Sequence, residues 1–182
     1  EVLAMIEIYD SRLYERMVNN KDFLQFSLGT GTQPSGFKVE TDYTSRYEDD
    51  WATHVKALVE KYSQQEDVPV ALDLRNQTLG LIGNYDVLKN TISNLYLQMA
   101  FFQSYRDLNF ITLVPEKSYV KDWQQWRFLP HFKVQGINTR GIVHNAKSRD
   151  IILSSFYQII NSRKQELNAA GREKPTFLPH FV

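Results

Sequence analysis

Apolar residues follow two different patterns along this chain, and the change between them divides it into two parts. In the first 66 residues, apolar side chains recur every three or four positions in two stretches, which is typical of amphipathic helices. Short runs of apolar residues that end at glycine or proline indicate strands between them. The elements expected here are helices at 2–17 and 51–62, a strand at 23–28 ended by Gly29-Thr30-Gly31-Thr32, and a strand at 37–40 after Pro34 and Gly36.

From Val68 onward, apolar strands alternate with helical stretches, which is the pattern of an α/β domain with a mostly parallel sheet. The stretch 109–114 is almost continuously apolar, as expected for a strand buried on both faces. Strands are expected at 68–74, 78–82, 109–114, 140–144 and 177–182, and helices at 87–103, 121–127 and 148–169, the last closed by Gly171. This predicts an N-terminal segment, 1–66, packed on an α/β domain, 67–182.

Charge and composition narrow the classes of partner. The chain has 21 basic and 21 acidic residues and no polybasic run, so we expect no useful binding to nucleic acid. The absence of cysteine fits a reducing compartment and excludes disulfides. No apolar run reaches the length of a membrane span. The chain starts inside a predicted helix and stops inside a predicted strand, so we expect a fragment of a longer protein.

The segment Gly83–Asn90 resembles a phosphate-binding loop that has lost parts of its motif. The motif GxxxxGK[ST] closes backbone N–H groups around phosphate, and its lysine and hydroxyl hold the terminal phosphates and Mg²⁺. Gly83 and Lys89 keep the spacing, but Leu88 replaces the second glycine, Asn90 replaces the hydroxyl, and Asp86 adds a negative charge. The motif and the preceding strand pattern favour a P-loop NTPase-like three-layer α/β/α fold. A chance Gly…Lys spacing in a strand–turn–helix is the alternative.

Other chemistry is sparse in the sequence. No residue is predicted to be catalytic, and the four histidines lack metal-ligand spacing, so no metal site is expected. Glu48, Asp49 and Asp50 suit the positive end of the following helix better than a metal. Trp123 and Trp126 are candidates for a partner contact, with packing in the core as the alternative.

An empty phosphate loop would leave N–H groups unpaired at a helix start. We therefore predict that Asp86, or failing that Asn84, caps the helix near Val87, and that Lys89 adds little to stability.

An ordered series of short motifs resembles the membrane-bound FtsK/SpoIIIE-type ATPase of type VII (ESX) secretion systems, the EssC/EccC/YukB family, and its Firmicutes branch in particular. The motifs extend over nearly the whole chain. They are Leu13-Tyr14-Glu15-Arg16, Asp22-Phe23-Leu24 leading to Leu28-Gly29-Thr30-Gly31, Val70-Ala71-Leu72-Asp73-Leu74, Leu79-Gly80-Leu81-Ile82-Gly83, Trp126-Arg127-Phe128-Leu129-Pro130-His131 and Arg140-Gly141-Ile142.

The resemblance is to the membrane-proximal module of that family, a degenerate ATPase-like domain. It implies a position at the cytoplasmic face of the bacterial plasma membrane, with 2–17 continuing a stalk from the membrane. The implied partners are ATPase domains and the membrane part of the same polypeptide, other secretion subunits, possible further copies in an oligomer, and indirectly WXG-type helical substrates.

Two functions follow from these observations. The first is a non-catalytic structural or regulatory domain that couples the membrane stalk to the ATPase modules, with no cofactor. The second is a weak but genuine ATPase, in which Lys89 holds phosphate, Asn90 coordinates Mg²⁺ imperfectly, and a carboxylate beyond Val182 completes the site. Leu88 and Asp86 favour the first.

Overall fold

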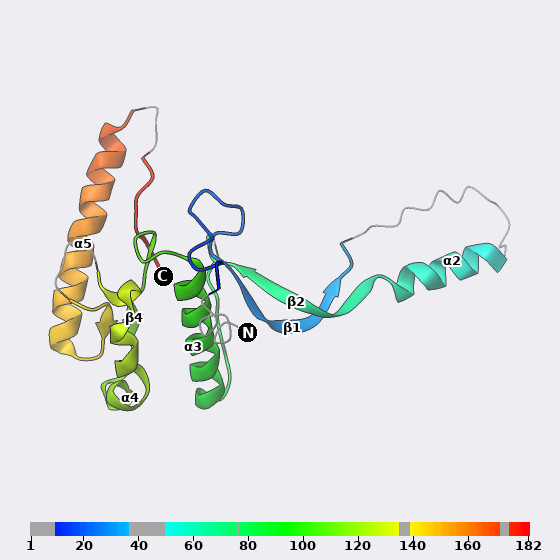
Figure 1. The fold of residues 1–182 in the computed structure, drawn as a ribbon, viewed down its shortest axis with the longest axis horizontal. Coiled ribbons are helices and arrows are strands. Elements are labelled where there is room, and N and C mark those ends of the chain that lie inside the picture. The colour runs from blue at the N-terminus through cyan, green and yellow to red at the C-terminus, as the bar shows by residue number, and fades with distance from the viewer. Residues whose placement is uncertain (1–9, 37–49, 76, 135–138, 172–174) are drawn as a thin grey trace. The chain divides into compact units, whose positions relative to one another are not determined.

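The computed structural model describes residues 10–36, 50–75, 77–134, 139–171 and 175–182 (Figure 1). The chain divides into two compact units, residues 25–80 and residues 1–24 together with 81–182. Each unit is described by itself. The predicted boundary at 66/67 falls inside a strand of the first unit, and that division into domains stays a prediction.

The unit of residues 25–80 contains a two-stranded antiparallel sheet. Strand β1 (Gln25–Pro34) pairs with β2 (Gln64–Asp73) from Gln25 opposite Asp73 to Pro34 opposite Gln64. The prediction that the glycines end β1 is wrong: the strand passes through Gly29 and Gly31, and two shifts of register absorb the irregularity. The prediction that 68–74 joins a parallel layer is wrong as well, because β2 pairs antiparallel with β1.

Helix α2 (Asp50–Lys61) precedes β2 in this unit. It confirms the helix predicted at 51–62 to within one residue. The strand predicted at 37–40 lies outside the described residues. The strand predicted at 78–82 is wrong, because these residues form no strand and the Ile82 side chain is fully exposed. An apolar run becomes a strand only where another strand pairs with it, and none does so here within the described residues.

The other unit contains two short pairs of parallel strands. Strand β3 (Leu108–Asn109) pairs with β6 (His180–Phe181), and β4 (Thr112–Leu113) pairs with β5 (Ile142–Val143). The Ile111 N–H donates to the Val182 carbonyl at 2.9 Å, and the Thr112 N–H donates to the Gly141 carbonyl at 2.7 Å. The predicted strand 109–114 is therefore hydrogen-bonded along both edges, although its β geometry is interrupted. The fold is mixed α/β with small parallel sheets.

Three further helical regions belong to this unit. Helix α3 (Tyr85–Phe102) begins two residues before the predicted start. The predicted helix 121–127 is instead a succession of short turns: α4 (Glu116–Ser118), a π-helical turn (Tyr119–Trp123) and two 3-10 turns (Gln124–Phe128 and Pro130–Phe132). Helix α5 (Ala146–Ala169) starts at a capping box of Asn145 and Ser148. Gly171, with φ of 60°, adopts the left-handed conformation expected after a helix end.

The predicted N-terminal helix 2–17 is wrong in its described part. Residues 2–9 lie outside the described ranges, and residues 10–17 form turns, with Tyr14 at a positive φ of 60°. Two of their N–H groups bond outside the segment: Tyr14 donates to the Phe101 carbonyl at 2.8 Å and Arg16 to the Phe102 carbonyl at 3.0 Å. These bonds cap the C-terminus of α3, and they replace the intrahelical bonds that periodicity predicts.

The core of this unit centres on Phe110, which is fully buried. Its ring lies 5.1 Å from Tyr96, 5.3 Å from His131 and 5.2 Å from Phe132, measured between centroids. His131 is also buried, with Nε2 2.8 Å from the Gln103 carbonyl, and burial lowers the pKa of its ring. Within the described ranges, no helix has the length and apolar character needed to cross a bilayer.

Candidate functional site

The candidate loop leads directly into helix α3, and its cap is Asn84. The Asn84 backbone is extended, with φ of −66° and ψ of 142°, and its side-chain oxygen accepts a hydrogen bond from the Asp86 N–H at 2.9 Å. The first choice predicted from the sequence, Asp86, is wrong, and the second, Asn84, is confirmed. Because the helix starts at Tyr85, Asp86 lies inside its first turn, where its charge still complements the helix dipole.

Replacing Asn84 with alanine should destabilise the protein by about 1 kcal/mol, because the Asp86 N–H loses its partner at the helix start. Urea unfolding followed by circular dichroism measures this. Asn94 is exposed on the same helix, so Asn94→Ala is the matched control and should cause no loss. Equal stabilities for Asn84→Ala and Asp86→Ala would contradict the assignment of the cap.

Leu88 stands at the position of the second glycine of the motif. The side chain of Leu88 lies close to the first glycine, Gly83. A side-chain carbon added to Gly83 would lie 3.8 Å from Leu88 Cδ2. The Leu88 N–H donates to the Asn84 carbonyl at 2.9 Å as an ordinary helical bond. The N–H groups of residues 86 and 88 therefore already have partners within the loop and helix.

Lys89 takes part in an ion pair with Asp122, which lies in the π-helical turn. Its Nζ lies 3.2 Å from Asp122 Oδ1 and 3.5 Å from Asp86 Oδ1. The Asp122 side chain is 8% exposed and that of Lys89 is 25% exposed. Tyr85 Oη donates to the second Asp122 oxygen at 3.0 Å and accepts from Trp123 Nε1 at 3.3 Å. Lys89 is thus part of a network of five residues, and the expectation that it adds little to stability no longer follows.

The charges of the pair stabilise one another. The hydrogen bond to Asp122 raises the pKa of Lys89. Burial alone would raise the pKa of the Asp122 carboxyl, but the hydrogen bonds from Lys89 and Tyr85 outweigh it, so that pKa is lowered. At neutral pH the lysine is a cation whose counter-ion is a carboxylate of the same chain.

The remaining predicted site residues lie apart from this network or at its edge. Asn90 is exposed on α3, and the described ranges contain no cluster of three or more His, Asp or Glu side chains that could hold a metal. Trp123 is buried, as the core-packing alternative expects. Trp126 packs edge-on against Tyr96 at 5.4 Å, and a partner contact for it stays a prediction.

Sequence reasoning missed Tyr85 and Asp122. Asp122 is 33 positions from Lys89, and no local spacing links them. The only available signal was negative: an uncompensated lysine beside apolar residues needs a counter-ion from elsewhere in the chain.

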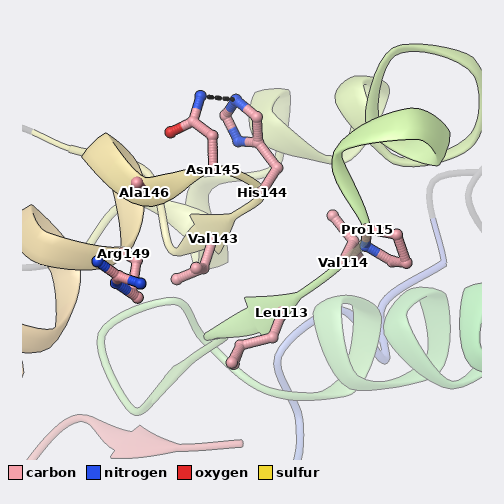
Figure 2. Close-up of a pocket in the computed structure, with 8 residues that line it drawn as sticks. All are labelled: Leu113, Val114, Pro115, Val143, His144, Asn145, Ala146 and Arg149. Carbon is pink, nitrogen blue, oxygen red and sulfur yellow. Dashed lines mark hydrogen bonds between the residues drawn. The ribbon is translucent and has the colours of Figure 1, made fainter.

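A hollow of about 360 Å³ lies at the carboxyl ends of β4 and β5 (Figure 2). Figure 2 shows Leu113, Val114 and Pro115 on one side and the segment from Val143 to Arg149 on the other. Two of its polar side chains are engaged locally. The Asn145 side chain caps α5 through the Ser148 N–H at 2.9 Å, and Arg149 pairs with Asp150 at 2.9 Å. The Nδ1 atom of His144 is buried without a hydrogen-bond partner. None of the residues that line this hollow belongs to the network around Lys89.

Comparison with known proteins identifies relatives along almost the whole chain. The ESX secretion system protein YukB of Bacillus subtilis is 37% identical over 179 residues, which is 97% of this chain and 12% of YukB. The ESX secretion system protein EccC of Geobacillus thermodenitrificans is 31% identical over 176 residues, or 95% of this chain and 12% of EccC. The type VII secretion system protein EssC of Staphylococcus aureus is 31% identical over 188 residues, covering the chain completely and 12% of EssC. The chain is a homologue of one segment of these secretion proteins.

The relatives confirm the resemblance drawn from the short motifs. The chain spans about 12% of the length of the ESX proteins that it matches. No protein-family model matches the chain.

Proposed function

We propose that this chain is a non-catalytic, ATPase-like module of a type VII secretion protein, and that it couples a membrane stalk to ATPase modules of the same polypeptide. The proposal includes a three-layer P-loop-like α/β/α architecture for the complete domain, a place at the cytoplasmic face of the bacterial membrane, and no bound nucleotide. Homology to YukB and EssC supports a role in secretion.

The observation that carries the proposal is the ion pair between Lys89 and Asp122. In a working loop, the lysine is the cation that meets the terminal phosphates. Here a carboxylate already lies 3.2 Å from its Nζ, and a second lies 3.5 Å away. An incoming triphosphate would have to displace Asp122 and accept the nearby negative charge of Asp86, which opposes its binding.

Two further features support the same conclusion. The Leu88 side chain lies beside Gly83, where backbone and phosphate would approach one another. Asn84 satisfies the Asp86 N–H, a group that phosphate would otherwise bind.

The weak ATPase is the second candidate, and calorimetric titration with ATP and Mg²⁺ separates the two. We expect no saturable binding for the parent chain up to about 1 mM ATP, a range in which even a site of about −4 kcal/mol is half filled. Saturable, Mg²⁺-dependent binding that Lys89→Ala abolishes would overturn the proposal in favour of the weak ATPase.

Thermal unfolding tests the structural role of the lysine independently. Lys89→Ala should lower the melting temperature, because it leaves the buried Asp122 carboxylate without its counter-ion. Lys117 is exposed on α4, so Lys117→Ala is the matched control and should leave the melting temperature unchanged. An unchanged melting temperature for Lys89→Ala would show that the ion pair with Asp122 does not stabilise the protein.

A further inference from the structure

Three polar side chains lie inside the core near the C-terminal end of α3. Gln103 and Asn109 are 0% exposed, and His131 is 1% exposed. Each has a buried polar atom that finds no hydrogen-bond partner in the part of the chain that the structure describes: Nε2 and Oε1 of Gln103, Oδ1 of Asn109 and Nδ1 of His131. An unpaired buried donor or acceptor costs more free energy than a hydrogen bond contributes, so folded proteins rarely keep one.

Hydrogen bonds bring these three residues into one region. His131 Nε2 lies 2.8 Å from the Gln103 carbonyl oxygen. The His131 carbonyl accepts from the N–H of Phe110, the residue after Asn109, at 2.9 Å. Asn109 Nδ2 donates to the Tyr105 carbonyl at 2.9 Å, and the Tyr105 ring centre lies 6.3 Å from that of His131. The end of α3, the start of β3 and a 3-10 turn therefore meet around these residues.

The chemistry of the unpaired atoms favours a neutral guest that donates hydrogen bonds. Because a carbonyl oxygen only accepts, His131 Nε2 carries the ring hydrogen and Nδ1 is an acceptor. Gln103 Oε1 and Asn109 Oδ1 are acceptors as well, whereas Gln103 Nε2 is a donor. A buried ion would need an opposite charge beside it, and none of these three neutral side chains provides one.

We propose that the side chains of Gln103, Asn109 and His131 bind internal water. Water donates two hydrogen bonds and accepts others, so it can pair with the three acceptors and with the single donor group. Globular proteins hold about one buried water per 27 residues, typically on polar groups that the chain itself leaves unpaired. Here the water joins the end of α3 to β3 and the 3-10 turn. The inference uses no residue of the network around Lys89, so it does not depend on the proposed function.

A crystal structure that shows ordered solvent tests the proposal directly. We expect water within about 3.2 Å of both Nε2 and Oε1 of Gln103, the limit for such hydrogen bonds. A Gln103 amide that bonds only to protein atoms, or that has no water beside it, would overturn the proposal.

Urea unfolding of Gln103→Met tests it in solution, because methionine keeps the length of the side chain and removes the amide. The folding equilibrium constant should fall about tenfold, since the bound water and its other partners lose hydrogen bonds. If the amide had no partner, the substitution would remove an unpaired buried group and raise the midpoint. An unchanged or raised midpoint would therefore overturn the proposal. Gln158 is exposed on α5, so Gln158→Met is the matched control and should leave the midpoint unchanged.

Discussion

The substitution Gly141→Ala should destabilise the protein by about 3 kcal/mol, at the upper end of what overpacking costs. A Cβ atom on residue 141 would lie 2.0 Å from the Phe110 carbonyl oxygen and 3.4 Å from Val134 Cγ2. The backbone cannot retreat easily, because Gly141 donates to the Phe132 carbonyl at 2.7 Å and accepts from the Thr112 N–H at 2.7 Å. Relieving the clash therefore breaks bonds that join β4 to the segment before β5.

Gly80→Ala is the matched control, since a Cβ at residue 80 would meet no atom within 4 Å. It should change the free energy of unfolding by less than about 0.5 kcal/mol. Urea unfolding followed by circular dichroism compares the two variants. Equal stabilities would show that the strands near Phe110 are not in the close contact described here.

The second large effect is expected for Phe110→Ala, which should cost about 3 to 5 kcal/mol. The Phe110 ring is fully buried, stacks on His131 and Tyr96, and meets Phe132 edge-on. Its removal leaves a cavity among aromatic rings that rigid strands and α3 hold in place, so the gap can close only in part.

Phe128→Ala makes the same chemical change at an exposed ring and should stay within about 0.5 kcal/mol of the parent. The same denaturant series measures both variants. A loss at Phe128 comparable to that at Phe110 would mean that the exposed ring is part of the core, contrary to its position.

Long periodic segments could be predicted from the sequence. The helices predicted at 51–62, 87–103 and 148–169 appear with ends displaced by at most two residues, because each has a continuous apolar face over three or more turns. The strand at 109–114 was recognisable from its apolar run, since burial on both faces leaves little room for polar side chains.

Errors arose where a distant partner decides the structure. Residues 10–17 have a helical period, but their N–H groups bond to the end of α3. The apolar run at 78–82 would need a neighbouring strand to become one. The start of α3 was predicted two residues too late, and for that reason Asp86 was preferred to Asn84 as the capping residue.

The sequence singled out a candidate loop, but it did not show the contacts that the loop residues make. The spacing of Gly83 and Lys89 suggests a phosphate-binding loop, and Leu88 departs from its motif. The counter-ion, Asp122, lies in an irregular turn that no periodicity predicts. Only the folded chain brings the two charges together.

The hydrogen bonds from Tyr14 and Arg16 to the last carbonyls of α3 have a mechanical consequence. The Arg16 guanidinium also lies 4.0 Å from the centre of the Phe102 ring, so the backbone and the side chain of Arg16 both contact the C-terminal end of α3. An α-helix of 18 residues is a stiff rod about 27 Å long. The segment at residues 14–16 and the contact between Lys89 and Asp122 thus bear on opposite ends of one stiff helix.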